Sequence, residues 1–226
     1  IMLVTEYARS TQAFAVESVE DIVRLDWKQV LSADNSGAGR NMVTSIARLD
    51  GNADGTRLAQ VLDVEAILQM VSPSSAPQID DSPKVGAELN LRPGTIILAA
   101  DDSFVARSLI ERGLKAMHAP FEMTKSGKEA WDRLNAIADA AEAEGKTVLD
   151  KISLVLTDLE MPEMDGFTLT RKIKQDPRFS KIPVVIHSSL SGSANEDHVR
   201  SVGADAYVAK SVAEDLAKTI RSVLPR

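Results

Sequence analysis

Residues 96–102 have the sequence IILAADD, and this stretch decides how the larger part of the chain folds. Five apolar residues end abruptly in two carboxylates, Asp101 and Asp102. A short, unbroken apolar run is typical of a strand buried on both faces of a parallel sheet. Ligands of such sheets bind beyond the carboxyl ends of the strands. The acid pair is therefore expected at the mouth of a binding site.

From residue 95 onward, short apolar strands alternate with helices, which implies crossover connections and a parallel sheet. We expect strands at residues 95–100, 121–124, 152–157, 184–188 and 206–209. We expect helices at residues 103–117, 127–144, 166–175, 195–202 and 212–224. This part is predicted to be an α/β domain with a parallel five-stranded sheet.

Polar residues close three further strands of this series. Asp158 follows the third strand, Ser188 ends the fourth, and Lys210 follows the fifth. Three carboxylates at one mouth repel each other unless a cation binds, and an all-oxygen ligand set beside a phosphoryl group favours Mg²⁺. A hydroxyl and an ammonium suit the oxygens of a phosphoryl group in transfer. We expect Asp158 to attack and form an acyl phosphate.

Each of these residues also has a structural alternative. The acid pair before Ser103 could cap the next helix. Asp158 alone could be a turn residue, and Lys210 alone a solvated surface lysine. Residues 161–166 could form only a turn. The joint pattern favours the site, because each polar group closes a different strand.

The first 71 residues differ from the rest, being mostly β. Strands are expected at residues 1–7, 11–16, 19–25, 42–49 and 57–62, with a helix at 64–71. Residues 72–94 are rich in Pro, Ser and acid, and we interpret them as a linker. The predicted organisation is a β part at 1–71, a linker at 72–94 and the α/β part at 95–226.

Composition limits the classes of partner. The net charge of -7 argues against nucleic acid as a ligand. The chain has no cysteine, and no apolar run reaches the length of a membrane span. We expect a soluble protein of the cytoplasm whose partners are proteins.

Residues 97–103 (ILAADDS), residues 156–166 (LTDLEMPEMDG), Ser188 and Lys210 together resemble the response-regulator receiver domain of two-component systems. The resemblance covers residues 95–224 and implies a flavodoxin-like fold. It further implies that the domain accepts a phosphoryl group from a kinase phosphohistidine and is not an enzyme. It implies Ser188 as a switch, with Tyr207 moving inward; core packing is the alternative for Tyr207. The implied ligands of Mg²⁺ are Asp101, Asp102, Asp158 and the backbone carbonyl of Glu160.

Three residues depart from the receiver pattern. Ser211 follows Lys210 where most receivers have Pro, which leaves the cis peptide of the family open here. Ser189 stands where a smaller residue is common, and Glu160 adds an acid. We expect these differences to slow attack by water, so that the acyl phosphate is long-lived.

The β part resembles the second half of a CheW-type coupling domain, an SH3-like barrel, through residues 13–19, 22–25, 45–50 and 61–65. An unrelated small β-barrel is the alternative. With residues 186–192 (IHSSLSG) added, the whole resembles the chemotaxis coupling proteins of the CheV family, without the first subdomain of the coupling module. This implies docking on the histidine kinase CheA and on chemoreceptors (methyl-accepting chemotaxis proteins), tuned by phosphorylation of the receiver.

The alternatives to this role are other receiver proteins, a transcriptional regulator and a phosphatase. Another two-component response regulator or a phosphate-sink receiver would use the same receiver chemistry. A transcriptional regulator would need a basic recognition helix. A haloacid-dehalogenase-type phosphatase needs a second Asp two residues after the nucleophile, where this chain has Glu160.

Overall fold

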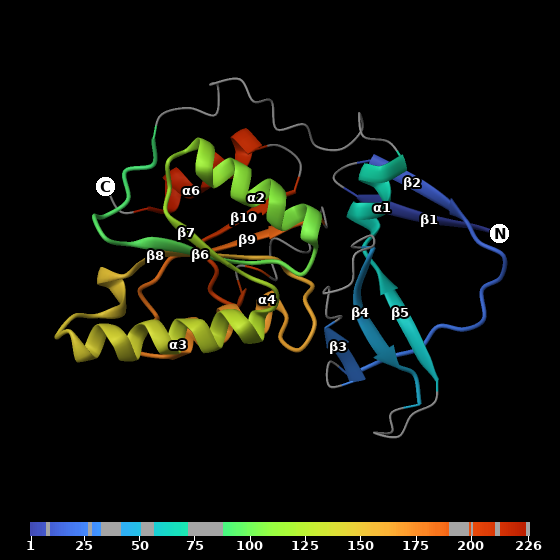
Figure 1. The fold of residues 1–226 in the computed structure, drawn as a ribbon, viewed down its shortest axis with the longest axis horizontal. Coiled ribbons are helices and arrows are strands. Elements are labelled where there is room, and N and C mark those ends of the chain that lie inside the picture. Colours follow the sequence, from blue (N-terminus) through green and yellow to red (C-terminus); the bar gives the residue numbers. More distant parts are fainter. Residues whose placement is uncertain are drawn as a thin grey trace.

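The computed structural model describes residues 1–7, 10–26, 29–32, 42–50, 57–71, 88–189, 199, 201–210 and 213–224. Figure 1 shows a β-rich part and a part in which helices cover a central sheet. The two parts come together at helices α1 (Val64–Val71) and α2 (Phe104–Ala116).

The central sheet has five parallel strands: β6 (Ile96–Ala100), β7 (Phe121–Thr124), β8 (Ile152–Thr157), β9 (Val184–Ser188) and β10 (Ala206–Ala209). Their spatial order is β10-β9-β8-β6-β7. In chain order this is the 2-1-3-4-5 arrangement of flavodoxin-like folds. The predicted α/β class is confirmed, and each predicted strand of this part is present.

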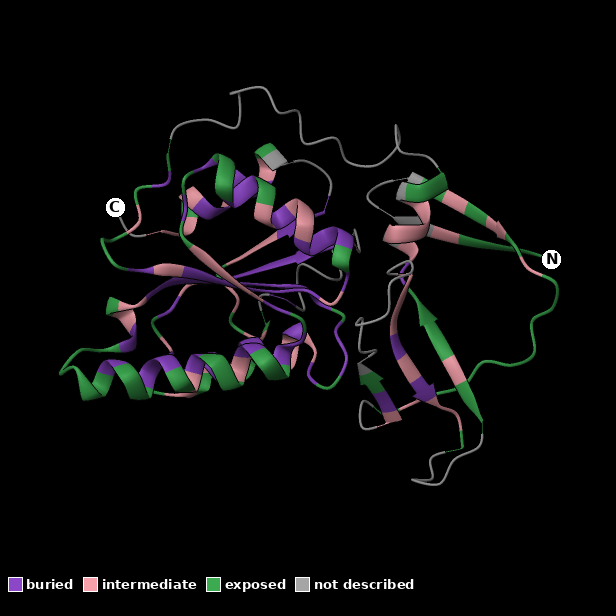
Figure 2. Cartoon of the chain, viewed as in Figure 1, coloured by how far each residue is buried: buried purple, intermediate pink, exposed green. Residues whose placement is uncertain are grey.

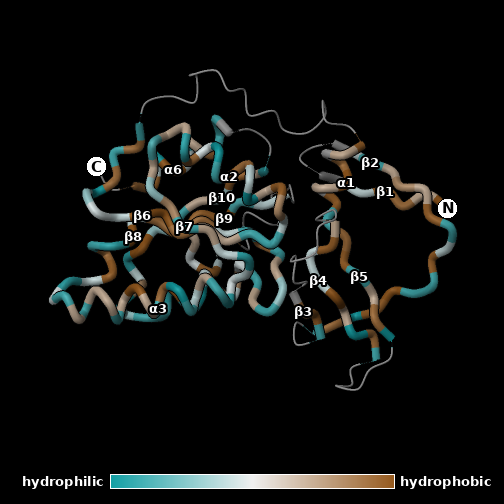
Figure 3. Tube along the Cα trace, in the orientation of Figure 1, coloured by the Kyte–Doolittle hydropathy of each residue, from teal (hydrophilic) through white to brown (hydrophobic). Residues whose placement is uncertain are grey.

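Helices cover both faces of the sheet. Figure 1 shows α2 and α6 (Ala213–Val223) on one face, and α3 (Gly127–Ala143) and α4 (Gly166–Gln175) on the other. Each face carries its own apolar cluster. Every residue of β8 is buried, and the central strands are purple in Figure 2 and mostly brown in Figure 3. The helix predicted at residues 195–202 falls largely outside the described residues, although Val199 is helical and buried.

The β-rich part contains two antiparallel sheets. Strands β1 (Met2–Tyr7) and β2 (Ser10–Ala15) form one, and β3 (Val30–Ser32), β4 (Val43–Arg48) and β5 (Leu58–Leu62) form the other in that order. The mainly β prediction for this part is confirmed. The three-residue strand β3 was not predicted.

The strand predicted at residues 19–25 is wrong. No strand is formed there, and Val19, Ile22 and Val23 are exposed, with Ile22 at 90%. Clustered apolar residues indicate a strand only where a neighbouring strand pairs with the backbone and covers one face.

Part of the predicted linker packs onto the sheet domain. Leu89 is buried in the core cluster on the α2 side, and its N–H donates to the carbonyl of Met117 at 3.1 Å. Leu91 packs against the same cluster. Residues 72–87 lie outside the described residues. None of the described helices is long and apolar enough to cross a membrane.

Candidate functional site

Three carboxylates meet beyond the carboxyl ends of the neighbouring strands β6 and β8. Oxygens of Asp101, Asp102 and Asp158 all lie within 4.8 Å of one another. Asp101 and Asp158 are buried, while Asp102 is half-buried. The parallel register aligns the ends of the two strands, so residues far apart in sequence meet at one edge. The predicted cluster of carboxylates is thus present in the structure.

Backbone hydrogen bonds orient two of these carboxylates. The Asp158 N–H donates to the carbonyl of Ala100 at 2.8 Å, and its Oδ1 accepts from the N–H of Leu159 at 2.7 Å. The Oδ1 of Asp101 accepts from the N–H of Ser103 at 2.9 Å. The cap of α2 is Ser103 itself, whose hydroxyl accepts from the N–H of Ala106. Helix capping therefore does not account for the acid pair.

Lys210 lies between two of the carboxylates. Its Nζ is 2.8 Å from Oδ2 of Asp101 and 3.1 Å from Oδ2 of Asp158. Its side chain is 5% exposed, so the alternative of a solvated surface lysine is wrong. The Lys210 N–H donates to the carbonyl of Ser188 at 2.8 Å, which ties the ends of β9 and β10 together. A buried cation here offsets the mutual repulsion of the carboxylates.

The remaining predicted site residues surround this cluster. Ser188 is the last residue of β9 and is buried, and it pairs with Ala209 on the neighbouring strand β10. Tyr207 faces Ile186, two residues before Ser188, and is half-buried against a small apolar cluster. Glu160 is exposed just after the phosphoacceptor candidate. Ser211 lies outside the described residues, so its peptide bond is not described.

The loop after β8 leaves no room for a side chain at Gly166. A Cβ built there would lie 2.0 Å from the carbonyl oxygen of Asp158. The Gly166 N–H also donates to the carbonyl of Leu159 at 2.8 Å. Met161 and Met164 anchor the loop in the core. The close approach at Gly166 fixes the backbone that carries Asp158.

A buried histidine stands one residue before Ser188. Burial, and secondarily the charge of Lys210, lowers the pKa of His187 from 6.5 to about 3. Its Nδ1 is buried without a hydrogen-bond partner. The imidazole is therefore neutral at physiological pH. No role for His187 is predicted from the sequence.

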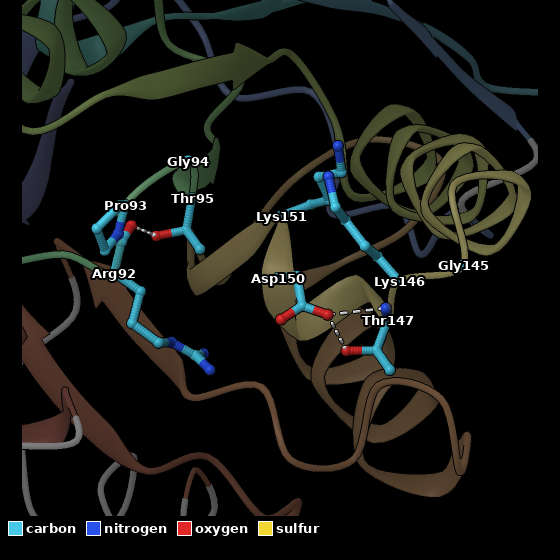
Figure 4. Close-up of a pocket in the computed structure, with 9 residues that line it drawn as sticks. All are labelled: Arg92, Pro93, Gly94, Thr95, Gly145, Lys146, Thr147, Asp150 and Lys151. Atoms are coloured by element: carbon cyan, nitrogen blue, oxygen red, sulfur yellow. Dashed lines mark hydrogen bonds between the residues drawn. The ribbon is translucent and has the colours of Figure 1, made fainter.

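A cavity lies at the amino end of the strands (Figure 4), opposite the carboxylate cluster and beside Thr95 and Lys151. Its charged groups are mostly satisfied internally. Lys146 and Lys151 both pair with Glu144, and the hydrogen bonds from Lys151 and Lys146, with a smaller effect of their charges, lower the pKa of that carboxylate to about 2. Asp150 accepts hydrogen bonds from Thr147. This cavity lacks the convergent, buried carboxylates of the other end.

Comparison with known proteins supports a two-domain organisation. Residues 97–221 match the response regulator receiver domain family, and residues 1–72 match the CheW-like domain family. The chain is 32% identical to the chemotaxis protein CheV1 of Helicobacter pylori, over 99% of this chain and 66% of that protein. It is 29% identical to CheV3 of the same organism, over 100% of this chain and 70% of that protein. The chain thus spans about two thirds of the length of these curated relatives.

Comparison with solved structures supports the fold of the receiver part. The structure of a putative response regulator from Chloroflexus aurantiacus superposes with a TM-score of 0.51 at 20% identity. The match covers 60% of this chain and 100% of that chain. At this identity the likeness supports the fold alone.

Proposed function

We propose, on the premise that this chain belongs to the response regulator receiver domain family and carries a CheW-like domain ahead of the receiver, that it is a chemotaxis coupling protein switched by phosphorylation of Asp158. The observation that carries the proposal is the cluster of Asp101, Asp102 and Asp158 with the ammonium of Lys210 between two of them. The likeness of nearly the whole chain to chemotaxis proteins supports the cellular role.

The donor set fits a hard divalent cation. Asp101, Asp102 and Asp158 offer only oxygen ligands, two of them buried, and the backbone carbonyl of Glu160 is the proposed fourth ligand. Bound Mg²⁺ would supply positive charge to a phosphoryl group during its transfer. Lys210, which follows β10, supplies a second positive charge 3.1 Å from Oδ2 of Asp158.

The transfer itself needs a fixed nucleophile. A carboxylate oxygen of Asp158 attacks the phosphorus of a phosphohistidine; the new P–O bond forms as the P–N bond breaks, and the imidazole leaves with the electron pair. The hydrogen bond from the Leu159 N–H to Oδ1 holds the attacking carboxylate. Ser188 and Lys210 then contact the phosphoryl oxygens, and Ser188 moves as the switch together with Tyr207. The protein is a phosphoryl acceptor rather than an enzyme, and Ser189 and Glu160 slow its hydrolysis.

The CheW-like part is the output of this switch. It docks on the histidine kinase CheA and on chemoreceptors at the cytoplasmic face of the membrane, and the phosphoryl state shifts the population of the docked form. The contact of α1 with α2 supplies a physical route, because α2 begins directly after the acid pair.

Phosphotransfer from radiolabelled CheA tests the proposal. The parent should take up label, and Asp158→Asn should not. Asp139→Asn is the matched control, since Asp139 is an exposed aspartate on α3. Sedimentation with receptor-containing membranes should differ between the labelled and unlabelled parent. Label uptake by Asp158→Asn would contradict the proposed acceptor, and equal sedimentation would contradict the proposed output.

A further inference from the structure

Arg107 holds the backbone of the acid pair from the first turn of α2. Its Nη1 donates to the carbonyl of Asp101 at 2.9 Å and to the carbonyl of Asp102 at 2.7 Å. Its own N–H donates to the carbonyl of Ser103 at 3.0 Å, within the helix. The residue is only 9% exposed. One guanidinium nitrogen thus bridges the two carbonyls of the candidate metal-binding residues.

Burying a guanidinium group costs free energy unless its charge is compensated. Buried guanidinium groups are normally paired with carboxylates. The ion pairs formed among the described residues do not include Arg107; two main-chain carbonyls hold its charge instead. The ring of Phe104 lies 6.0 Å from its Cζ on the outer side. The guanidinium is therefore enclosed by the loop, the helix and an aromatic ring.

The two carbonyl bonds constrain where the carboxylates point. A peptide unit is planar, so fixing the direction of a carbonyl fixes the plane between that residue and the next. Asp102 lies between the two fixed planes, so its side chain leaves the backbone in a set direction. Asp101 has one of these planes after it, and the plane before it is held by the hydrogen bond from its N–H to the carbonyl of Thr124 at 3.2 Å.

The charge of Arg107 acts on the same cluster without blocking it. Lys210 contacts carboxylate oxygens of Asp101 and Asp158 directly, and these are atoms that a metal ion would use. The hydrogen bonds of the Arg107 side chain go to the carbonyl oxygens of Asp101 and Asp102. Arg107 therefore adds positive charge beside the acid pair through its carbonyl contacts rather than through the carboxylate oxygens.

We propose that Arg107 is a positioning residue for the divalent-metal site: it fixes the backbone of Asp101 and Asp102 and lowers the repulsion between their carboxylates. This inference rests on the proposed function, because it concerns the same metal site. The competing explanation is that Arg107 only stabilises the start of α2. That explanation predicts a loss of stability in Arg107 variants with no change in metal affinity.

Calorimetric titration of the full chain with Mg²⁺ separates the two explanations, together with the thermal unfolding midpoint in metal-free buffer. Arg107→Met should weaken Mg²⁺ binding by about tenfold or more, the range found when residues that orient metal ligands are removed. Arg107→Lys should bind Mg²⁺ more tightly than Arg107→Met, since an ammonium keeps the charge and N–H donors although it lacks the planar guanidinium. Arg112→Met, at an exposed site on the same helix, is the matched control and should bind as the parent does.

A folded Arg107→Met protein with the Mg²⁺ affinity of the parent would overturn the inference. If that variant does not fold, Arg107→Gln decides, because it keeps N–H donors but removes the charge. Weaker Mg²⁺ binding than the parent supports the inference, and equal binding overturns it. Absence of Mg²⁺ binding by the parent is a different result, which would overturn the metal site of the proposed function itself.

Discussion

Gly166→Ala is the substitution with the most specific expected consequence. The added Cβ would lie 2.0 Å from the carbonyl oxygen of Asp158 and 3.1 Å from the Cα of Leu159, both of them backbone atoms. Ordinary contact begins near 3.4 Å, so the loop must open by about 1.4 Å at the oxygen. No flexible side chain can absorb this movement, and the displaced residue is the proposed phosphoacceptor.

Two quantities should change together. Overpacking of this kind costs roughly 1–3 kcal/mol of unfolding free energy. A displacement of about 1 Å at a reacting group can slow a reaction by about a hundredfold. We therefore expect Gly166→Ala to be less stable in urea denaturation and to be phosphorylated far more slowly by acetyl phosphate.

Gly113→Ala is the matched control. Gly113 lies inside α2, nothing lies within 4 Å of a Cβ built there, and its φ is not in the left-handed region. Replacing a helix-interior glycine by alanine stabilises by up to about 1 kcal/mol, and the rate of phosphorylation should not change. A Gly166→Ala protein with the stability and phosphorylation rate of the parent would refute the argument from close approach.

Three further changes test other parts of the structure. Lys210→Met leaves buried carboxylates without their cation, so the free energy of unfolding in Mg²⁺-free buffer should fall by about 3–5 kcal/mol. Added Mg²⁺ should stabilise this variant more than the parent. Equal stabilisation of both proteins by Mg²⁺ would contradict the proposal that Lys210 and the metal ion act on the same carboxylates. The pKa of His187 is lowered from 6.5 to about 3 in the folded protein, so between these two pH values only the unfolded chain binds a proton at this residue. The unfolding free energy of the parent should therefore fall by up to about 1.4 kcal/mol for each pH unit as the pH is lowered from 6.5 towards 3. His187→Leu should remove that slope in urea denaturation, exposed His118→Asn should keep it, and equal slopes in both variants would contradict the burial argument. Leu89→Ala should lower the free energy of unfolding by about 2–5 kcal/mol in the same assay, because its side chain is in the core. A loss near zero would indicate that Leu89 belongs to the linker and does not contribute to the core.

The sheet domain could be predicted because its signals are local. Each strand is a short apolar run, and four of the five end at a residue type with a distinct chemistry. The parallel sheet and the meeting of Asp101 with Asp158 at one edge follow from one rule about parallel sheets. The spatial order of the strands was implied only by the resemblance to receiver domains. The burial of Lys210 followed only from the joint pattern. Taken alone, its residue type favours the surface.

The features that were not predicted depend on tertiary contacts, which the local sequence pattern does not reveal. The apolar residues at 19–25 lack a pairing strand, and β3 is too short to show periodicity. Leu89 and Leu91 sit in a polar stretch, yet the edge of the sheet domain offers them a core to join. The contact of Arg107 with the acid pair could have been predicted from its position. Arg107 lies four residues after the cap Ser103, on the face of α2 that turns back towards the acid pair.

The most direct test of the central claim is intact-protein mass spectrometry after incubation with acetyl phosphate and Mg²⁺, comparing the parent with Asp158→Ala. The structure predicts a gain of one phosphoryl group in the parent and none in the variant, because the carboxylate of Asp158 lies in the only cluster of three potential metal-binding acids among the described residues. A phosphoryl gain that persists in Asp158→Ala, or no gain in the parent, would contradict it.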